Sequence, residues 1–219
     1  MSDVFEEEAT YNPGIFSVSS EQQARDIILT QEADQDSRER WVRETPYLTN
    51  LILSKVKLDE DSLVLDYGCG VGRISKELIT ITNCTSIGVD ISSSMRGYAA
   101  TYVDDDNFFA CPPKSFEKIG ALWRCDLAIA VWVLQHCLEP EEDLRTIISS
   151  LYQGGKLFVV NMITRAVPTL ERGWVNDGVD IRQVIKNVGF KELEVGELDP
   201  TIVPKALSEL TFWGLYEKP

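Results

Sequence analysis

Short apolar segments alternate with longer amphipathic segments through most of the chain beyond residue 60. Short apolar runs are typical of buried strands, and apolar residues spaced three and four apart predict helices between them. Strands are predicted at 63–65, 85–89, 107–110, 126–131 and 156–161. Strands that alternate with helices form a parallel sheet covered on both faces, and the unbroken apolar run 127–131 fits burial on both sides. The pattern therefore predicts a doubly wound, Rossmann-like α/β fold.

The C-terminal part of the chain follows a different pattern. Gly154-Gly155 is predicted to turn the chain into the fifth strand, and Gly189 closes a helix. The elements predicted here are helices over 140–152 and 180–188 and strands at 190–195 and 211–217. The last two strands are predicted to form a hairpin-like pair, which would add an antiparallel strand to the parallel sheet.

The first 56 residues precede this alternation and are predicted to belong to the same domain as the core at 57–219. The acidic lead, residues 1–18, is either a disordered tail or a lid over a pocket. Ser19-Ser20-Glu21 offers a helix N-cap, and a second helix is predicted over 37–55.

Charge and hydropathy narrow the class of protein. The chain has 219 residues, a formal net charge of −14 and no apolar run of the roughly 20 residues that a membrane-spanning helix needs. Its first residues lack the basic and apolar regions of a secretory signal. Nucleic-acid binding depends on Lys and Arg against phosphate, so this acidic chain is not expected to bind DNA or RNA. We expect a soluble, cytoplasmic protein.

The arginines near the N-terminus do not form a basic patch in the sequence. Arg38, Arg40 and Arg43 are interrupted by Glu39 and Glu44. This alternation of sign predicts a mixed, solvent-facing helix surface.

The cysteine and histidine content predicts no metal site. Five cysteines, an odd number, occur without any CxxC pair, and His136 is the one histidine. Zinc sites need clustered Cys and His ligands at short spacing. The cysteines are therefore expected to be reduced residues of the core.

The segment 63–73 carries the strongest functional signal. A strand ends in Asp66, and a loop with Gly68, Gly70 and Gly72 then opens a helix. Glycines allow a ligand to approach the backbone closely, and a helix N-terminus offers free N–H donors to a carboxylate. Asp66 can accept hydrogen bonds from a cationic amino group. A ligand with an ammonium and a carboxylate at one end, such as the methionine half of S-adenosylmethionine, would satisfy both groups.

The next predicted strand supplies a second carboxylate. Asp90 ends the strand at 85–89 and lies 22 positions after Gly68. A carboxylate at this place in a nucleotide-binding α/β fold accepts the hydroxyls of a ribose. Ile91 and Met95 follow it and are expected to pack on the faces of an adenine.

A nicotinamide-dependent oxidoreductase is the alternative to compare. Its fingerprint is GxGxxG, whereas here the glycines fall at 68, 70 and 72 and Arg73 follows. An aspartate two residues before the first glycine would also repel a pyrophosphate. The combination of Asp66 and Asp90 favours S-adenosylmethionine.

From Leu63 onward the chain resembles the class I S-adenosylmethionine-dependent methyltransferases. The matching segments are LDYGCGVGR, IGVDISSSM, CDLAIAVWVLQHC and LYQGGKLFVVN, and the C-terminal segment also looks like the ending of that family. The first two segments are the specific ones. The resemblance implies a seven-stranded sheet whose last strand is antiparallel and inserted beside the parallel strands.

The resemblance also implies roles for individual residues. Toward the methionine part of the cofactor it places Asp66, Gly68, Cys69 and Gly70. Asp90 would hold the ribose with Ile91 beside the adenine, and the end of the fourth strand would line the pocket with Ala130, Val131 and Trp132. One departure concerns the adenine amino group. Many relatives hold it with an aspartate after the third strand, where this chain has Cys111 followed by Pro112-Pro113.

The acceptor side has no readable motif. Trp132 and Trp174 are candidates for the wall of an acceptor pocket, with Trp41 closing it or packing in the core. His136 is a candidate general base, since histidine titrates near neutral pH, or it braces the loop after the fourth strand. Methyl transfer depends mainly on proximity and alignment.

The predicted function is methyl transfer from S-adenosylmethionine to an O, N or C atom of a small molecule. Three alternatives stay open: a protein methyltransferase, whose basic acceptor the acidic surface would suit, the oxidoreductase, and a non-catalytic adaptor that keeps the fold.

Overall fold

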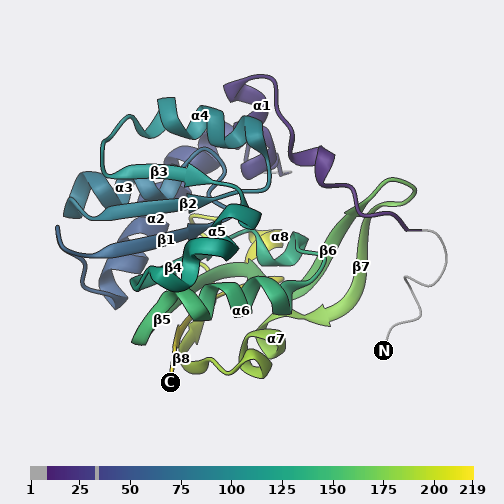
Figure 1. Cartoon of the computed structure of the whole chain (residues 1–219). Helices are drawn as coiled ribbons and strands as arrows, with labels where there is room; N and C mark the ends of the chain where they lie inside the picture. Colours follow the sequence, from purple (N-terminus) through teal and green to yellow (C-terminus); the bar gives the residue numbers. More distant parts are fainter. Residues whose placement is uncertain (1–8, 33–34) are drawn as a thin grey trace.

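The computed structural model describes residues 9–32 and 35–219, and within them seven strands form one sheet in the order β3-β2-β1-β4-β5-β9-β8 (Figure 1). The strands are Leu63–Tyr67 (β1), Thr85–Val89 (β2), Phe108–Cys111 (β3), Cys125–Val131 (β4), Leu151–Met162 (β5), Lys191–Gly196 (β8) and Thr211–Glu217 (β9). β9 pairs antiparallel with both β5 and β8, and the other pairs are parallel. The predicted fold is confirmed, and β9, the last strand of the chain, lies between β5 and β8 in the sheet.

Helices cover both faces of this sheet, as the alternation of strands and helices predicted. Leu48, Leu78 and Val103 lie in one core cluster, whereas Phe116, Leu144 and Ile185 lie in another. The helices that pack into the first cluster are α2 (Ser37–Lys55), α3 (Arg73–Thr82) and α4 (Ser93–Val103). Those that pack into the second are α5 (Pro113–Ile119), α6 (Pro140–Ser150) and α7 (Ile181–Val188). The strands contribute alternate residues to the two clusters because successive side chains of a strand point to opposite faces.

The N-terminal segments cap their helices as the sequence predicted. The Ser20 side chain accepts a hydrogen bond from Gln23 N at the start of α1 (Glu21–Ile28). α2 has the predicted bounds and begins with a capping box formed by Asp36 and Glu39. A short 3₁₀ helix, η2 (Pro13–Phe16), precedes α1. The first eight residues of the acidic lead lie outside the described residues.

The hairpin after β5, helix α5 and the four-residue helix α8 (Lys205–Ser208) were not predicted. A hairpin of β6 (Thr164–Thr169) and β7 (Gly173–Asp180) follows β5 as a separate two-stranded sheet that extends beyond the main body (Figure 1). Its residues are mixed in polarity because much of one strand is exposed, so no clean alternation marks it. Helix α5 begins at Pro113, where the fixed φ of proline suits the first turn.

The predicted turn at Gly154-Gly155 is wrong. β5 begins at Leu151 and continues through both glycines, so the preceding helix α6 ends at Ser150. The pairing of β4 with β5 shifts register between Cys125 and Leu127, and Gly154 adopts a φ of 78°. A bulge at glycine therefore absorbs the extra residues without ending the strand.

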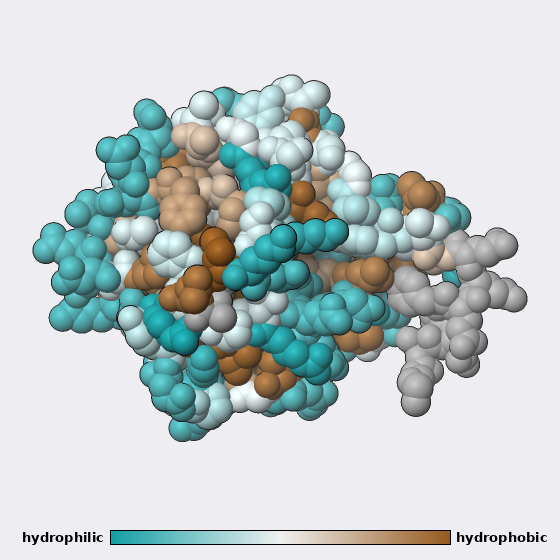
Figure 2. All heavy atoms as spheres, viewed as in Figure 1, coloured by the Kyte–Doolittle hydropathy of each residue, from teal (hydrophilic) through white to brown (hydrophobic). Residues whose placement is uncertain are grey.

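The viewed surface is largely polar, with apolar side chains gathered near β3 and α5 (Figure 2). Exposed apolar residues in this region include Phe109, Ile119 and Leu122. Because β3 is an outer strand of the sheet, this apolar patch flanks an unpaired strand edge. None of the helices in the described ranges is both long and apolar enough to cross a bilayer.

Candidate active site

A cavity of about 770 Å³ opens at the carboxyl ends of β1, β2 and β4. It is lined by the loop after β1, by the start of the segment after β2, and by residues 131–139 after β4. In open α/β sheets, ligands bind in the crevice at the carboxyl ends of strands, where the strand order reverses direction. The glycine loop and the second carboxylate predicted from the sequence therefore meet in one cavity.

The glycine loop needs its glycines for conformation and for space. Gly68 and Gly70 have φ values of 77° and 54°, in the left-handed region that residues with a Cβ rarely adopt. A Cβ on Gly68 would lie 2.3 Å from Val133 Cγ2, and one on Gly70 would lie 2.8 Å from Ile28 Cδ1. The loop is thus a cradle whose open backbone faces the cavity.

Asp66 is a buried carboxylate on the floor of this cradle. One of its oxygens accepts a hydrogen bond from Ser75 Oγ at 2.6 Å, and Ser75 Oγ lies 2.9 Å from Ser86 Oγ. Burial raises the pKa of Asp66 to about 6, and the nearby negative charge of Asp90 adds to the rise. A carboxylate with this pKa is stabilised in its charged form by a cationic ligand group.

Asp90 ties the loops after β1 and β2 together. Its Oδ2 accepts from Gly70 N and its Oδ1 accepts from Ser92 N, both at 2.8 Å. Burial raises its pKa, while these two backbone donors oppose the rise. The N-cap of α4 is Ser92, whose hydroxyl accepts from Met95 N. Capping is therefore not the role of Asp90, which lines the cavity.

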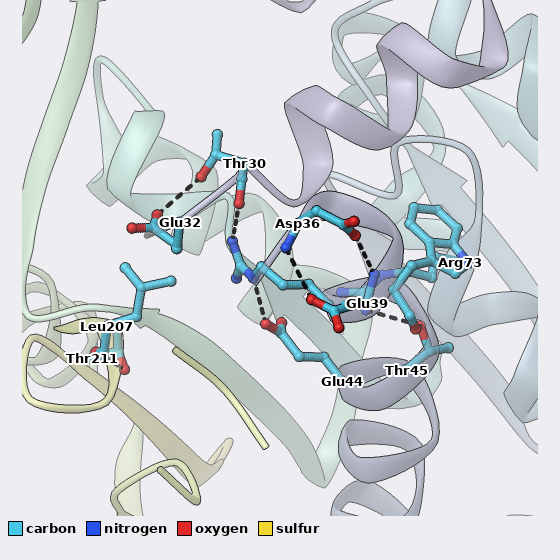
Figure 3. Close-up of polar contacts among 11 residues, drawn as sticks. Thr30, Glu32, Asp36, Glu39, Glu44, Thr45, Arg73, Leu207 and Thr211 are labelled. Carbon is cyan, nitrogen blue, oxygen red and sulfur yellow. Dashed lines mark hydrogen bonds and ion pairs between the residues drawn. The ribbon is translucent and has the colours of Figure 1, made fainter. Parts of the chain in front are cut away.

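Two buried arginines also line the cavity, one from α2 and one from α3. Figure 3 shows Arg73 beside Thr45, with Glu44 and Thr30 nearby. Arg40 Nε donates to Glu44 Oε1 at 2.6 Å, and its Nη1 donates to Thr30 O at 2.7 Å. Arg73 Nη1 donates to Thr45 Oγ1 at 3.1 Å. Burial, opposed by Glu44 and reinforced by Arg40, lowers the pKa of Arg73 to about 10, so it stays charged at neutral pH. Arg40 and Arg73 thus place two guanidinium groups at the cavity wall, where Glu44 pairs with Arg40 and Asp66 also acts on Arg73.

The predicted solvent-facing helix surface around these arginines is wrong for Arg40 and Glu44. Both side chains are buried, and Glu44 Oε2 has no hydrogen-bond partner within the described part of the chain. Arginine and glutamate four residues apart also occur on exposed helix faces, so the sequence alone does not mark burial. Trp41 does not line the cavity; it packs against Arg25 and Arg73, whose guanidinium carbons lie 5.5 and 5.4 Å from its ring centroid.

All but one of the remaining residues predicted to contact the cofactor also line the cavity. They are Cys69, Ile91, Met95, Val131 and Trp132. Ala130 does not line it, because its side chain is fully buried in the core cluster beneath. Trp132 has a φ of 60°, unusual for a bulky residue, and its indole Nε1 is buried without a partner among the described residues. Such strain is characteristic of functional sites.

His136 lines the cavity, and both of its ring nitrogens are engaged. Gln135 Oε1 accepts from Met162 N at 2.8 Å, which directs the Gln135 amide nitrogen at His136 Nε2, 3.0 Å away. His136 Nε2 is therefore an acceptor, and Nδ1 donates to Ala166 O at 2.9 Å. Burial lowers the pKa of His136, which favours the same neutral form. In this arrangement its lone pair is not available to an acceptor's proton.

Tyr11 and Asp143 line the cavity but were not predicted from the sequence. Tyr11 forms a β-bridge with Thr169 of the hairpin, and burial raises its pKa to about 12. Asp143, in the first turn of α6, accepts a hydrogen bond from the Tyr67 hydroxyl. An acidic first turn is common in helices, and the lead carries no motif, so neither position was distinguishable by pattern.

The described residues hold no group of three or more His, Cys, Asp or Glu placed to bind a metal ion. Charged groups in the cavity lining include the carboxylates of Asp66, Asp90 and Asp143 and the buried guanidinium groups of Arg40 and Arg73.

Comparison with known proteins places this site in a family. A family model described as a methyltransferase domain matches residues 32–194, which include the glycine cradle, both carboxylates and His136. The chain belongs to this methyltransferase family. No curated protein matches it in sequence. The resemblance seen in the sequence is confirmed, and the match extends it upstream to include helix α2.

Solved structures agree with the methyltransferase fold. Magnesium protoporphyrin IX methyltransferase from Synechocystis, with bound S-adenosylhomocysteine, superposes with a TM-score of 0.66 at 17% identity, over 94% of this chain and 97% of the other. Geranyl diphosphate C-methyltransferase from Streptomyces coelicolor, also with S-adenosylhomocysteine, has a TM-score of 0.62 at 10% identity, over 86% and 83%. A [4+2]-cyclase has a TM-score of 0.61 at 15% identity, over 87% and 86%. At such identities the likeness concerns the fold.

Proposed function

We propose that this methyltransferase binds S-adenosylmethionine in its glycine cradle and methylates a small molecule. The observation that supports this most is the pair of carboxylates beside the glycine cradle, the buried Asp66 and the half-buried Asp90. A Cβ on Gly68 or Gly70 would collide with side chains that line the same cavity. When bound, S-adenosylmethionine supplies a methyl carbon on a sulfonium, which leaves as a neutral thioether when the acceptor's lone pair takes the methyl group.

The methionine end of the cofactor fits the charges at the loop after β1. Its ammonium would be held by Asp66, a buried carboxylate whose pKa burial raises to about 6. Its carboxylate would be held by the guanidinium groups that Arg40 and Arg73 place at the cavity wall. Opposite charges are thus matched at both groups.

The adenosine end fits the segment after β2. Asp90 would accept hydrogen bonds from the ribose hydroxyls, with Ile91 and Met95 packing against the adenine. A dinucleotide would instead place a diphosphate against the cradle, beside the buried and ionisable Asp66. Repulsion between these anions disfavours the oxidoreductase alternative.

The protein's contribution to transfer would be orientation and exclusion of water. His136 was a candidate base, but its lone pair is engaged by Gln135, so we assign it a positioning role at the cavity wall. The acceptor's proton then leaves to water, or the acceptor arrives already ionised.

Calorimetric titration with S-adenosylhomocysteine, and with NADH for comparison, tests this proposal. We expect binding of the first compound alone. Asp66→Asn keeps the side-chain shape and should weaken binding roughly thirtyfold or more, because the ligand's ammonium loses a buried charged partner. Asp61→Asn, at an exposed position before β1, is the matched control and should bind normally. Unchanged affinity in Asp66→Asn, or binding of NADH instead, would refute the proposal.

A further inference from the structure

One wall of the cavity is built from aromatic rings that come from three separate segments. Phe16 belongs to η2, His136 to the 3₁₀ helix η4 (Leu134–His136), and Trp174 to β7. The ring centroids of His136 and Trp174 are 4.7 Å apart, and Phe16 lies 5.9 Å from His136 and 6.3 Å from Trp174. All three residues line the cavity, so we call them the ring wall.

The polar groups of His136, one of the three rings, are already satisfied within the protein. His136 uses both nitrogens, on Ala166 O and on the Gln135 amide. Gln135 also accepts from Met162 N, which fixes the orientation of its amide. A ligand that meets the His136 ring therefore finds an aromatic surface whose nitrogens are already engaged. Polar ligand groups buried against it would lose their hydrogen bonds to water without replacement.

Apolar side chains contribute to the lining of the same cavity, and part of the ring wall is exposed. Ile15, Met162 and Leu207 line the same cavity. Trp174 is 48% exposed and Ile15 is 38% exposed. Large apolar side chains that stay exposed beside a cavity are typical of ligand-binding sites, because a ligand covers them.

The segments that carry the ring wall are held together by backbone hydrogen bonds. Asn12 N donates to Pro168 O at 2.9 Å, and Leu170 N donates to Thr10 O at 3.0 Å, so the chain before η2 pairs with the hairpin. Val18 N, just after η2, donates to Ser94 Oγ at 2.9 Å. The described part of the lead thus crosses from the hairpin to α4 and fixes Phe16 in place. This supports the lid alternative for residues 9–18.

From these observations we infer that the methyl acceptor is a planar, ring-bearing small molecule, aromatic or conjugated, that packs on the ring wall. The inference rests on the proposed function, since it names the acceptor of that same site. Aromatic pairs prefer offset or edge-to-face contacts with centroids about 4.5 to 7 Å apart, and rings from three segments offer a ligand several such contacts.

The state of His136 agrees with a ring-borne nucleophile. Because the lone pair of His136 is engaged, the imidazole is not available to take a proton from the acceptor. An acceptor that ionises without a strong base therefore suits this site. A phenolic hydroxyl ionises near pH 10, far more readily than an aliphatic alcohol. A hydroxyl conjugated to a ring would therefore reach its nucleophilic form by releasing its proton to water.

Two matched probes test the inference: 2-naphthol, which is planar and aromatic, and decahydro-2-naphthol, its saturated counterpart of similar size. Each is titrated calorimetrically into the full chain saturated with S-adenosylhomocysteine. We expect 2-naphthol to bind about three- to tenfold more tightly, the advantage that aromatic contacts give beyond burial of area. Equal binding of the two probes, or failure of both to bind, would overturn the inference.

Substitutions in the ring wall test which residues cause the preference for 2-naphthol. In the double variant Phe16→Leu and Trp174→Leu, the aromatic preference should disappear while affinity for S-adenosylhomocysteine is retained. Phe109→Leu, an exposed ring outside the cavity lining, is the control and should keep the preference. A preference that survives in the double variant would overturn the inference.

The test of the ring wall can also be separated from the test of the proposed function. If S-adenosylhomocysteine does not bind, the same titrations are made on the chain alone. A ring preference that the double variant removes would then support the ring wall as a binding site while the proposed cofactor fails. Absence of that preference would refute both.

Discussion

The two sides of the cavity are built in different ways. The cofactor side takes its charged groups from Asp66, Asp90, Arg40 and Arg73, on elements that pack directly on the central strands. The ring wall takes Phe16, His136 and Trp174 from the lead, from a loop and from the hairpin, which lie far apart in sequence. Charge dominates the first side, and neutral ring surface dominates the second.

This difference separates two kinds of specificity. Buried charges recognise a ligand with a matching pattern of charges. Their desolvation lowers the stability of the fold even when no ligand is bound. Ring surfaces accept ligands of varied detail, provided that these are apolar and flat. Changes on the charged side should therefore alter stability and cofactor affinity together, whereas changes on the ring wall should alter acceptor choice.

The largest effect is expected at Glu44. Glu44→Gln removes the negative partner of the buried Arg40 and also the larger of the two negative charges that act on the buried Arg73. Breaking a buried pair in this way costs about 3 to 5 kcal/mol of the free energy of unfolding. Urea denaturation followed by circular dichroism measures the loss.

Glu141→Gln is the matched control for that change. Glu141 pairs with Arg145 at the same i, i+4 spacing on α6, but the two side chains are 49% and 64% exposed. Exposed pairs contribute about 0 to 1 kcal/mol, so this variant should unfold almost as the parent chain does. Similar losses in the two variants would contradict the view that the charged side depends on buried charge.

The sequence predicted the charged side better than the ring wall, for physical reasons. Asp66, Gly70 and Asp90 lie at strand ends where the chain must turn tightly, so a short motif carries both the fold and the site. The ring wall needs contacts between residues as distant as Phe16 and Trp174, which no local pattern specifies. Arg40 was missed for a related reason, since only tertiary packing buries its helix face.

A pH change should affect the cofactor side in two opposite directions. Burial raises the pKa of Asp66 to about 6 in the folded chain, above its ordinary value of 3.8. The penalty for ionised Asp66 is present above pH 6 and is relieved as the pH falls, so its contribution to stability improves between about pH 6 and pH 4. Affinity for S-adenosylhomocysteine should fall over the same range, by up to about tenfold per pH unit, because the ammonium needs the ionised carboxylate.

Thermal unfolding and calorimetry at about pH 7 and about pH 5 measure the two effects, with Asp66→Asn as the reference. The difference in stability between the parent and this variant isolates Asp66 from Asp90 and Asp143, whose pKa values burial also raises. An affinity that stays constant across this range in the parent chain would show that the carboxylate does not meet the ligand's charge.

The smallest effect is expected on the ring wall, where the change in stability with pH has the opposite sign to that of Asp66. Burial lowers the pKa of His136 below its ordinary 6.5, so its contribution to stability is present above that pH and is lost as the pH falls. Because the chain has one histidine, a proton NMR titration of the imidazole C2–H reads this group directly. We expect a midpoint below pH 6.5.

Gln135→Glu sharpens that measurement. A glutamate keeps an oxygen for Met162 N, but it places a negative charge beside His136 Nε2 where the amide now donates. The charge should raise the midpoint, because it favours the protonated imidazole. A parent midpoint at or above 6.5, or no upward shift in the variant, would mean that the Gln135 amide does not hold the lone pair. His136 would then regain its place as a candidate base, and the argument for an acceptor that ionises on its own would lose its chemical support.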